Sequence, residues 1–132
     1  MKIDHLGIAV RSIEESLKFY VEALGLCCTA REIVEEQGVQ VAMVPLGESR
    51  VELLEPTSDD TPVGRFLEKR GEGLHHVCIE VEDLAGRLAE LKALGARLID
   101  ESPRVGAENR RIAFVHPSSA HGVLLELVER SR

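Results

Sequence analysis

Two histidines and two glutamates stand at matching places in the two halves of this chain. His5 and His76 each open a short apolar segment, and Glu52 and Glu126 each interrupt one. A carboxylate inside an apolar strand is costly unless it is paired or bound to a cation. Imidazole nitrogens and carboxylate oxygens are also common ligands of first-row divalent metals. We therefore predict that these four side chains bind one divalent metal ion and leave coordination positions open.

A lone histidine or glutamate in a strand is more often a surface or structural residue than a metal ligand. The spacing of these four argues against that alternative. The two histidines are 71 residues apart, the two glutamates 74, and Gly25 and Gly95 are separated by 70. Such a nearly constant offset indicates an internal repeat with insertions in its turns. His75 alternates to the other face of its strand, and we expect it to be structural.

The elements that must position the four side chains follow the same repeat. In each half, the apolar pattern predicts a strand, a helix and three more strands. Ser12 and Glu15 have the spacing of a capping box, and Gly25 suits the end of that helix. Strand periodicity allows the histidine of the first strand and the glutamate of the last to face one side. The predicted strands are 3–10, 27–34, 39–45, 50–55, 74–81, 97–101, 110–116 and 123–129, and the predicted helices are 12–24, 63–69 and 83–94.

We predict an α+β fold built from two tandem βαβββ modules. The modules cover residues 1–56 and 74–132, and a polar linker, residues 57–73, joins them. A chain of 132 residues suits one such domain. We expect the modules to form an open, barrel-like mixed sheet around the metal site.

Composition excludes several classes of function. The formal net charge is −7 and there is no Trp, which argues against binding to nucleic acid. No apolar run is long enough to span a membrane and the chain does not start with a signal peptide, so we expect a cytoplasmic protein. Cys27, Cys28 and Cys78 fit neither a disulfide framework nor a zinc spacing, and we expect small buried side chains.

These residues resemble the vicinal oxygen chelate superfamily, which includes glyoxalases, bleomycin resistance proteins and dioxygenases. Within it, the sequence is most similar to the methylmalonyl-CoA epimerases. The run Leu74-His75-His76 and the segment that follows Glu52 are the most specific signals. The resemblance covers nearly the whole chain and is carried by residues 4–10, 36–39, 51–63, 73–81, 114–117 and 122–127.

The resemblance implies inversion of the methyl-bearing carbon between the carboxylate and the thioester of methylmalonyl-CoA. The same family implies a homodimer and a divalent metal cofactor, usually cobalt, with manganese, zinc or nickel as alternatives. Removal of the proton gives an enolate, whose charge the metal stabilises. Epimerisation needs an acid and a base on opposite sides of the carbon. Glu126 can serve on one side while it is also a ligand.

The sequence leaves two candidates for the group on the other side. Some relatives place a glutamate three residues after the glycine of the Glu36-Gln37-Gly38 turn, where this chain has Val41, which does not titrate. Lys18, on the first predicted helix, and Glu48, in a turn between strands, are the candidates that remain. The alternative for both is an ordinary solvated side chain.

An acyl-CoA substrate implies cations that meet its phosphates. Arg104, Arg110 and Arg111 lie in or beside one loop and are the predicted contacts. The alternative is a solvated basic loop. The family often has a lysine after the His-Pro pair, where this chain has Ser118, and His116 falls outside the repeat.

Two other functions fit the same scaffold. A glyoxalase, a lactoylglutathione lyase, would isomerise a glutathione hemithioacetal with similar ligands and similar chemistry. A small-molecule binding or resistance protein without a metal would have eroded ligand positions, whereas all four are filled here.

Overall fold

The computed structural model describes residues 1–131, which form two compact units. The N-terminal unit is His5–His75. The C-terminal unit combines Met1–Asp4 with the chain from His76 on. The division therefore falls inside two strands, β1 (Lys2–Ala9) and β5 (Gly73–Val81), and not in the predicted linker.

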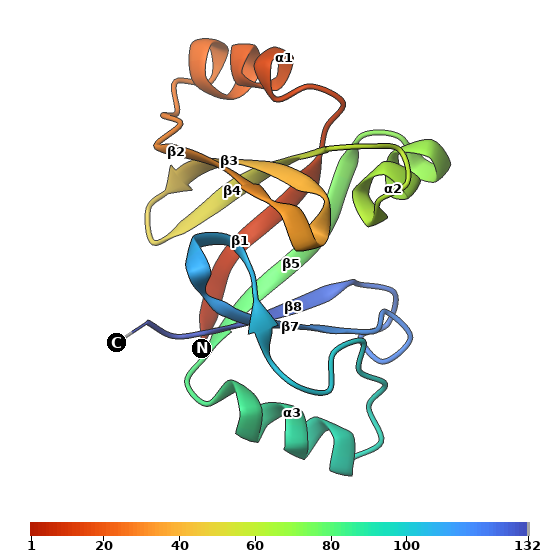
Figure 1. The fold of residues 1–132 in the computed structure, drawn as a ribbon. Coiled ribbons are helices and arrows are strands. Elements are labelled where there is room, and N and C mark those ends of the chain that lie inside the picture. Colours follow the sequence, from red (N-terminus) through yellow and green to blue (C-terminus); the bar gives the residue numbers. More distant parts are fainter. Residues whose placement is uncertain (132) are drawn as a thin grey trace. The chain divides into compact units, whose positions relative to one another are not determined.

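The N-terminal unit contains four strands in the order β2-β3-β4-β1. β1 is parallel to β4 (Ser49–Pro56), whereas β3 (Val39–Leu46) is antiparallel to β4 and to β2 (Ala30–Val34). Figure 1 shows α1 over one face of this sheet. The helical segments of this unit are α1 (Ile13–Leu17), a π-helical continuation η1 (Lys18–Ala23), a 3₁₀ turn η2 (Glu35–Gln37) and α2 (Pro62–Arg70).

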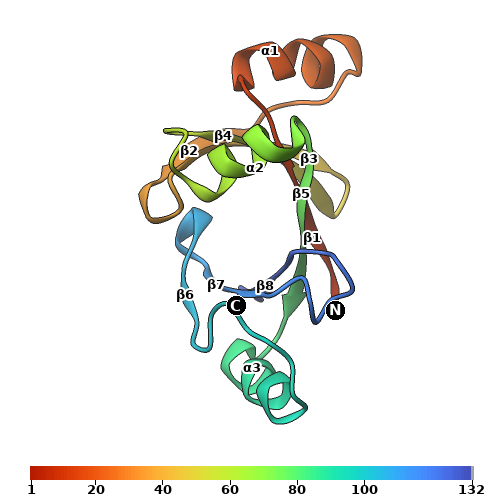
Figure 2. The ribbon, with the colours of Figure 1, turned by 90° about the vertical axis from the view of Figure 1, so that its right-hand side faces the viewer.

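The C-terminal unit repeats this plan with strands in the order β5-β8-β7-β6. β5 is parallel to β8 (Leu125–Glu129), and β7 (Arg111–Val115) is antiparallel to β8 and to the short β6 (Arg104–Val105). Figure 2 shows α3 (Leu84–Ala93) packed on one face of this sheet. A 3₁₀ turn, η3 (Ala107–Asn109), joins β6 to β7.

Each helix covers one face of its own sheet with buried apolar side chains. In the N-terminal unit, Ile13 of α1 and Leu53 of β4 are fully buried in this core. In the C-terminal unit, Leu84 and Leu88 of α3 pack in the same way on Leu127 of β8. The two tandem βαβββ modules predicted from sequence are therefore confirmed.

The start of each module's main helix is capped by a glutamate from that module's last strand. The Ile13 N–H donates to Glu55 Oε1 at 2.8 Å, and the Leu84 N–H donates to Glu129 Oε2 at 3.1 Å. The first N–H groups of a helix have no partner within the helix, so these carboxylates satisfy them and interact favourably with the helix dipole. The separations again repeat, since Ile13 and Leu84 are 71 residues apart and Glu55 and Glu129 are 74 residues apart.

We expect Glu55→Ala to lower the free energy of unfolding by about 1 kcal/mol, because the Ile13 N–H loses its acceptor. Urea denaturation followed by circular dichroism measures this change. Glu22→Ala is the matched control, because Glu22 is exposed on η1 and its replacement removes the same charge. Equal midpoints for the two variants would show that the cap contributes nothing.

One predicted strand, residues 97–101, is almost absent. Only Leu98 forms a β-bridge, to Val115. The ladder stops because Ile99 and Asp100 both donate their N–H groups to the Phe114 carbonyl, while the Asp100 side chain accepts the Phe114 N–H. A carboxylate thus replaces the backbone partner that a regular strand would supply. The predicted helices and the remaining strands are present with shifted ends.

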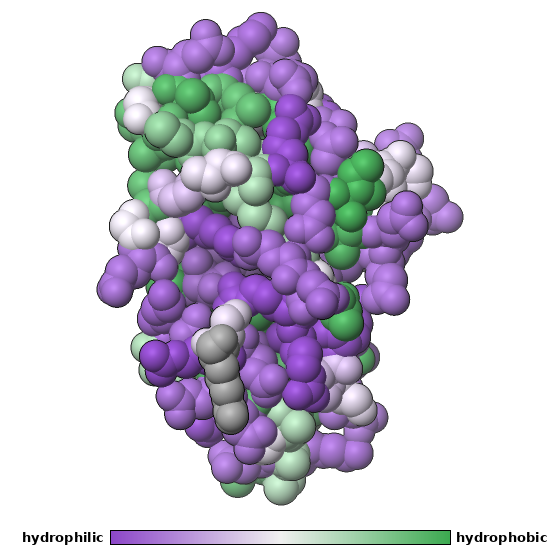
Figure 3. All heavy atoms as spheres, turned by 60° about the vertical axis from the view of Figure 1, so that its left-hand side comes forward, coloured by the Kyte–Doolittle hydropathy of each residue, from purple (hydrophilic) through white to green (hydrophobic). Residues whose placement is uncertain are grey.

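The surface of the N-terminal unit carries several large apolar side chains. Phe19, Leu24 and Ile33 are each more than half exposed. Figure 3 shows hydrophobic residues gathered on part of this unit. No helix within residues 1–131 is both long enough and apolar enough to cross a membrane.

Candidate functional site

The N-terminal unit pairs the first predicted histidine with the first predicted glutamate. His5 Nδ1 lies 3.2 Å from Glu52 Oε2, and both side chains are about 5% exposed. The pair forms because β1 runs parallel to β4 with Gly7 opposite Glu52. Arg50 donates to the same oxygen from Nε at 2.9 Å. Charge-assisted hydrogen bonds of this kind fix the orientation of a carboxylate.

The C-terminal unit contains the equivalent pair. His76 Nε2 lies 3.0 Å from Glu126 Oε1, and both side chains are buried. β5 runs parallel to β8 with Cys78 opposite Glu126. The His76 ring contacts the Phe114 ring edge to face, with 5.8 Å between the ring centroids.

The two pairs share one strand register. In each unit the glutamate stands opposite the residue two positions after the histidine, so both side chains leave the same face of the sheet. We call this the pair-bearing face; it is the face that the helix does not cover. Each pair combines an imidazole nitrogen with a carboxylate oxygen, a donor set that suits a first-row divalent ion. Each pair therefore offers the kinds of donor atom that such a metal ion takes.

Apolar side chains flank Glu52 on the β3 side of the pair-bearing face in the N-terminal unit. Met43 stands opposite Glu52 across the β3–β4 hairpin, and Val41 stands opposite Leu54. All of these side chains are buried. Val41 is therefore a buried apolar residue at the position where the resemblance implied a glutamate.

The two candidates for a second acid or base lie elsewhere in the N-terminal unit. Lys18 follows α1, on the helix-covered side, and its exposed ammonium pairs with Glu15 at 3.1 Å. Glu48 is exposed in the turn between β3 and β4. At about 3.3 Å per strand residue it lies roughly 13 Å along the strand from Glu52. The structure thus does not bring either residue to Glu52.

The three predicted arginines have separate surroundings in the C-terminal unit. Arg111 pairs with Glu129 at 3.1 Å, on the helix-covered side. Arg110 pairs with Asp4 at 2.8 Å and more weakly with Glu80 at 3.5 Å. Arg110 and Arg111 are therefore each paired with carboxylates of their own unit.

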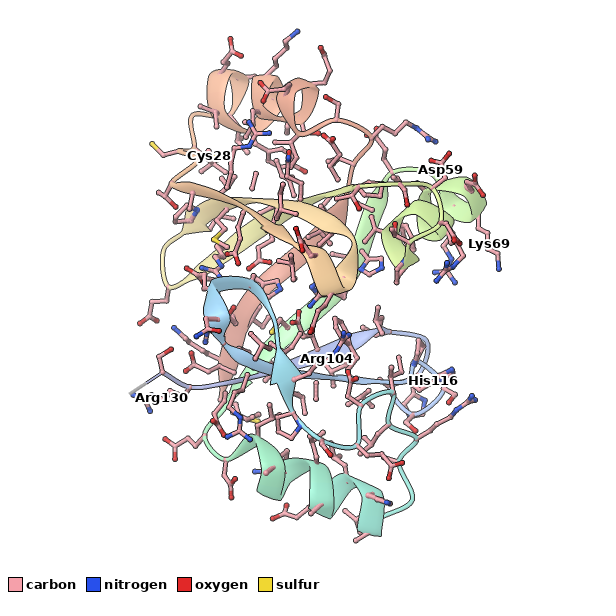
Figure 4. All side chains as sticks on the ribbon, viewed as in Figure 1. Cys28, Asp59, Lys69, Arg104, His116 and Arg130 are labelled. Carbon is pink, nitrogen blue, oxygen red and sulfur yellow. The ribbon has the colours of Figure 1, made fainter. Side chains whose placement is uncertain are left out.

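Arg104 differs from the other two arginines because it lies over an aromatic ring of the pair-bearing face. Its guanidinium carbon is 5.5 Å from the centroid of Phe114, the ring that also contacts His76. Figure 4 labels Arg104 beside β7.

The remaining histidines make structural contacts. In the N-terminal unit, the His75 ring packs against the Phe66 ring with 5.0 Å between centroids. In the C-terminal unit, His116 Nδ1 accepts the Ser118 N–H at 3.0 Å and closes the turn after β7. His75 is thus held by an aromatic contact, and His116 by a contact within its own turn.

Sequence reasoning missed Arg50, Asp100 and Phe114. The two-residue period of a strand could have identified Arg50, because a residue two positions before Glu52 must lie on the same face. Asp100 and Phe114 had no such signal, since their roles depend on contacts with Arg104 and His76 that sequence spacing does not predict.

Comparison with known proteins agrees with this arrangement. Residues 4–114 match the model of the glyoxalase/bleomycin resistance protein/dioxygenase superfamily. The chain belongs to this superfamily. The predicted fold class is thereby confirmed.

Among these relatives are methylmalonyl-CoA epimerases. The mitochondrial enzyme of Dictyostelium discoideum is 36% identical over 98% of this chain and 78% of its own length. A solved structure of a variant of the Streptomyces coelicolor methylmalonyl-CoA epimerase, in complex with 2-nitronate-propionyl-CoA, is 39% identical. It has a TM-score of 0.95 and covers 99% of this chain and 95% of its own. An uncharacterized Bacillus subtilis protein, YqjC, is 45% identical over 97% of this chain and 91% of its own length. The resemblance to methylmalonyl-CoA epimerases is therefore confirmed.

Proposed function

We propose that this member of the superfamily is an epimerase that interconverts (2R)- and (2S)-methylmalonyl-CoA. The observation that carries the proposal is the pair of buried His–Glu contacts, which occur in the same register in both modules. Similarity to methylmalonyl-CoA epimerases over nearly the full chain supports the choice of substrate.

The proposed reaction removes the proton from the carbon between the thioester and the carboxylate. Glu126 is the proposed base, because its carboxylate oxygen is buried and is held at 3.0 Å by His76. A buried, oriented carboxylate needs little reorganisation to accept a proton. Glu52 is buried as well, opposite the buried side chain of Met43. Lys18 and Glu48 remain predictions for the opposite side of the carbon, although neither lies beside Glu52.

His5, Glu52, His76 and Glu126 are the proposed ligands of one divalent ion. When bound, the ion would act as a Lewis acid that stabilises negative charge on the thioester oxygen. Arg50 would hold Glu52 in its ligand orientation through the hydrogen bond from Nε. Cobalt is the proposed metal, with manganese, zinc or nickel as alternatives, because affinity order alone does not select among them.

A direct assay of two substrates tests the proposal. We expect turnover of (2S)-methylmalonyl-CoA, followed as formation of the 2R isomer, and no turnover of the hemithioacetal of methylglyoxal and glutathione. Ethylmalonyl-CoA in the same assay measures how strictly the alkyl group is selected. Turnover of the hemithioacetal alone would identify a glyoxalase. Tight binding of a small molecule without turnover or bound metal would favour the resistance-protein alternative.

We also retain two further predictions, a homodimer and a cytoplasmic location. The exposed apolar side chains Phe19, Leu24 and Ile33 are consistent with a surface that a second copy covers. Sedimentation velocity measures the oligomeric state.

A further inference from the structure

Arg104 reaches the pair-bearing face of the C-terminal unit because of how β6 packs on β7. Arg104 stands opposite Ile112 in this antiparallel pair, so both side chains leave the same face. Gly106 permits the close approach of the following turn, since a Cβ there would lie 2.7 Å from the Ile112 side chain. The hairpin therefore delivers one guanidinium to the face that carries His76 and Glu126.

A short row of contacts connects this guanidinium to the His–Glu pair. Arg104 lies over the ring of Phe114, the edge-to-face partner of His76, which in turn pairs with Glu126. Arg104 and His76 are thus separated by a single aromatic ring.

Asp100 holds Arg104 in this place without using all of its donors. Asp100 Oδ1 lies 3.2 Å from Arg104 Nε, while Oδ2 accepts the Phe114 N–H at 2.8 Å. Arg104 Nε is buried, yet it makes no hydrogen bond among the described residues. Because Nε faces Asp100, the two Nη groups are the donors that a planar, bidentate anion such as a carboxylate would meet.

From this geometry we propose that Arg104 binds the free carboxylate of the acyl group and selects malonyl-type thioesters over neutral acyl-CoA. The inference rests on the proposed function. The carboxylate carbon of a malonyl group is only two bonds from the thioester carbon, so the two groups that would meet the pair and Arg104 are close together on the substrate. The phosphates of CoA lie at the far end of the pantetheine arm. A phosphate contact, the role that the sequence predicts for Arg104, is the alternative that the test below distinguishes.

Binding of two inert ligands to the metal-loaded protein tests this proposal. Isothermal titration calorimetry gives the Kd of malonyl-CoA, which carries the carboxylate, and of propionyl-CoA, which lacks it. We expect Arg104→Met to weaken malonyl-CoA binding by about 10- to 100-fold and to leave propionyl-CoA binding unchanged. Arg104→Lys should keep part of the preference, because it retains the charge but loses the planar fork.

Arg111→Met is the matched control, because Arg111 lies on β7, the strand that pairs with β6, but its side chain pairs with Glu129 on the helix-covered side. It should keep the wild-type preference. An equal loss for both ligands in Arg104→Met and Arg104→Lys would overturn the proposal and indicate a phosphate or structural role, as would no loss for either ligand. A wild type that prefers malonyl-CoA through Arg104 but does not epimerise would refute the proposed function alone. A wild type that epimerises while Arg104→Met keeps its preference would refute this inference alone.

Discussion

Replacing Glu126 by glutamine is expected to reduce epimerisation by about a thousandfold, because the amide keeps the shape of the carboxylate but does not accept the proton. Deuterium incorporation from heavy water at the methyl-bearing carbon measures the proton-transfer step directly. The wild type should incorporate deuterium and Glu126→Gln should not. Glu126 is buried beside His76, so no bulk solvent replaces it at that position.

Glu129→Gln is the appropriate control for this experiment. It lies on the same strand, three residues further, and makes its contacts on the helix-covered side. The amide oxygen can still accept the Leu84 N–H, so the helix cap survives. Exchange at the wild-type rate in Glu126→Gln would show that another group removes the proton. Loss of exchange in both variants would point to damage to β8 and not to the chemistry.

Removing either histidine of the two pairs is expected to remove most of the bound metal. A four-ligand site that binds with about 10–16 kcal/mol loses roughly 3 kcal/mol with one ligand, which weakens binding more than a hundredfold. His5→Ala and His76→Ala should therefore have low metal content after dialysis, as measured by inductively coupled plasma mass spectrometry. The effect should be similar in the two variants, because each histidine lies two residues before the position that pairs with its glutamate.

His75→Ala separates this effect from loss of histidine in general. The His75 side chain packs on Phe66 and is adjacent to His76 in sequence. This variant should keep the wild-type metal content. Wild-type metal content in both His5→Ala and His76→Ala would contradict a shared metal site.

The features that sequence could predict are those that repeat or alternate. A constant offset identified the equivalent residues, and the two-residue period of strands placed each histidine on the face of its glutamate. The same reasoning anticipated the helix ends at Gly25 and Gly95, whose φ angles are +89° and +90°. Backbone positions with positive φ favour glycine, so the two modules also share the same backbone conformation at the end of the helix.

Features that depend on distant partners were beyond the sequence. Arg110 and Arg111 are neighbours in the chain, but one pairs with Asp4 and the other with Glu129. Strand alternation sends adjacent side chains to opposite faces, yet it does not identify the carboxylate that each one meets. The loss of strand 97–101 has the same origin, because it follows from one side chain, Asp100, that occupies a backbone position of the ladder.

The spacing of two carboxylates on each module's last strand links folding to the site. Glu126 and Glu129 are three residues apart, as are Glu52 and Glu55, and an odd spacing sends them to opposite faces. A slip of β8 by one residue would exchange the two faces, leaving the helix start without its acceptor and His76 without its partner. The helix cap can form only in the native strand register. A module whose helix start is capped therefore also has its proposed ligand glutamate on the pair-bearing face.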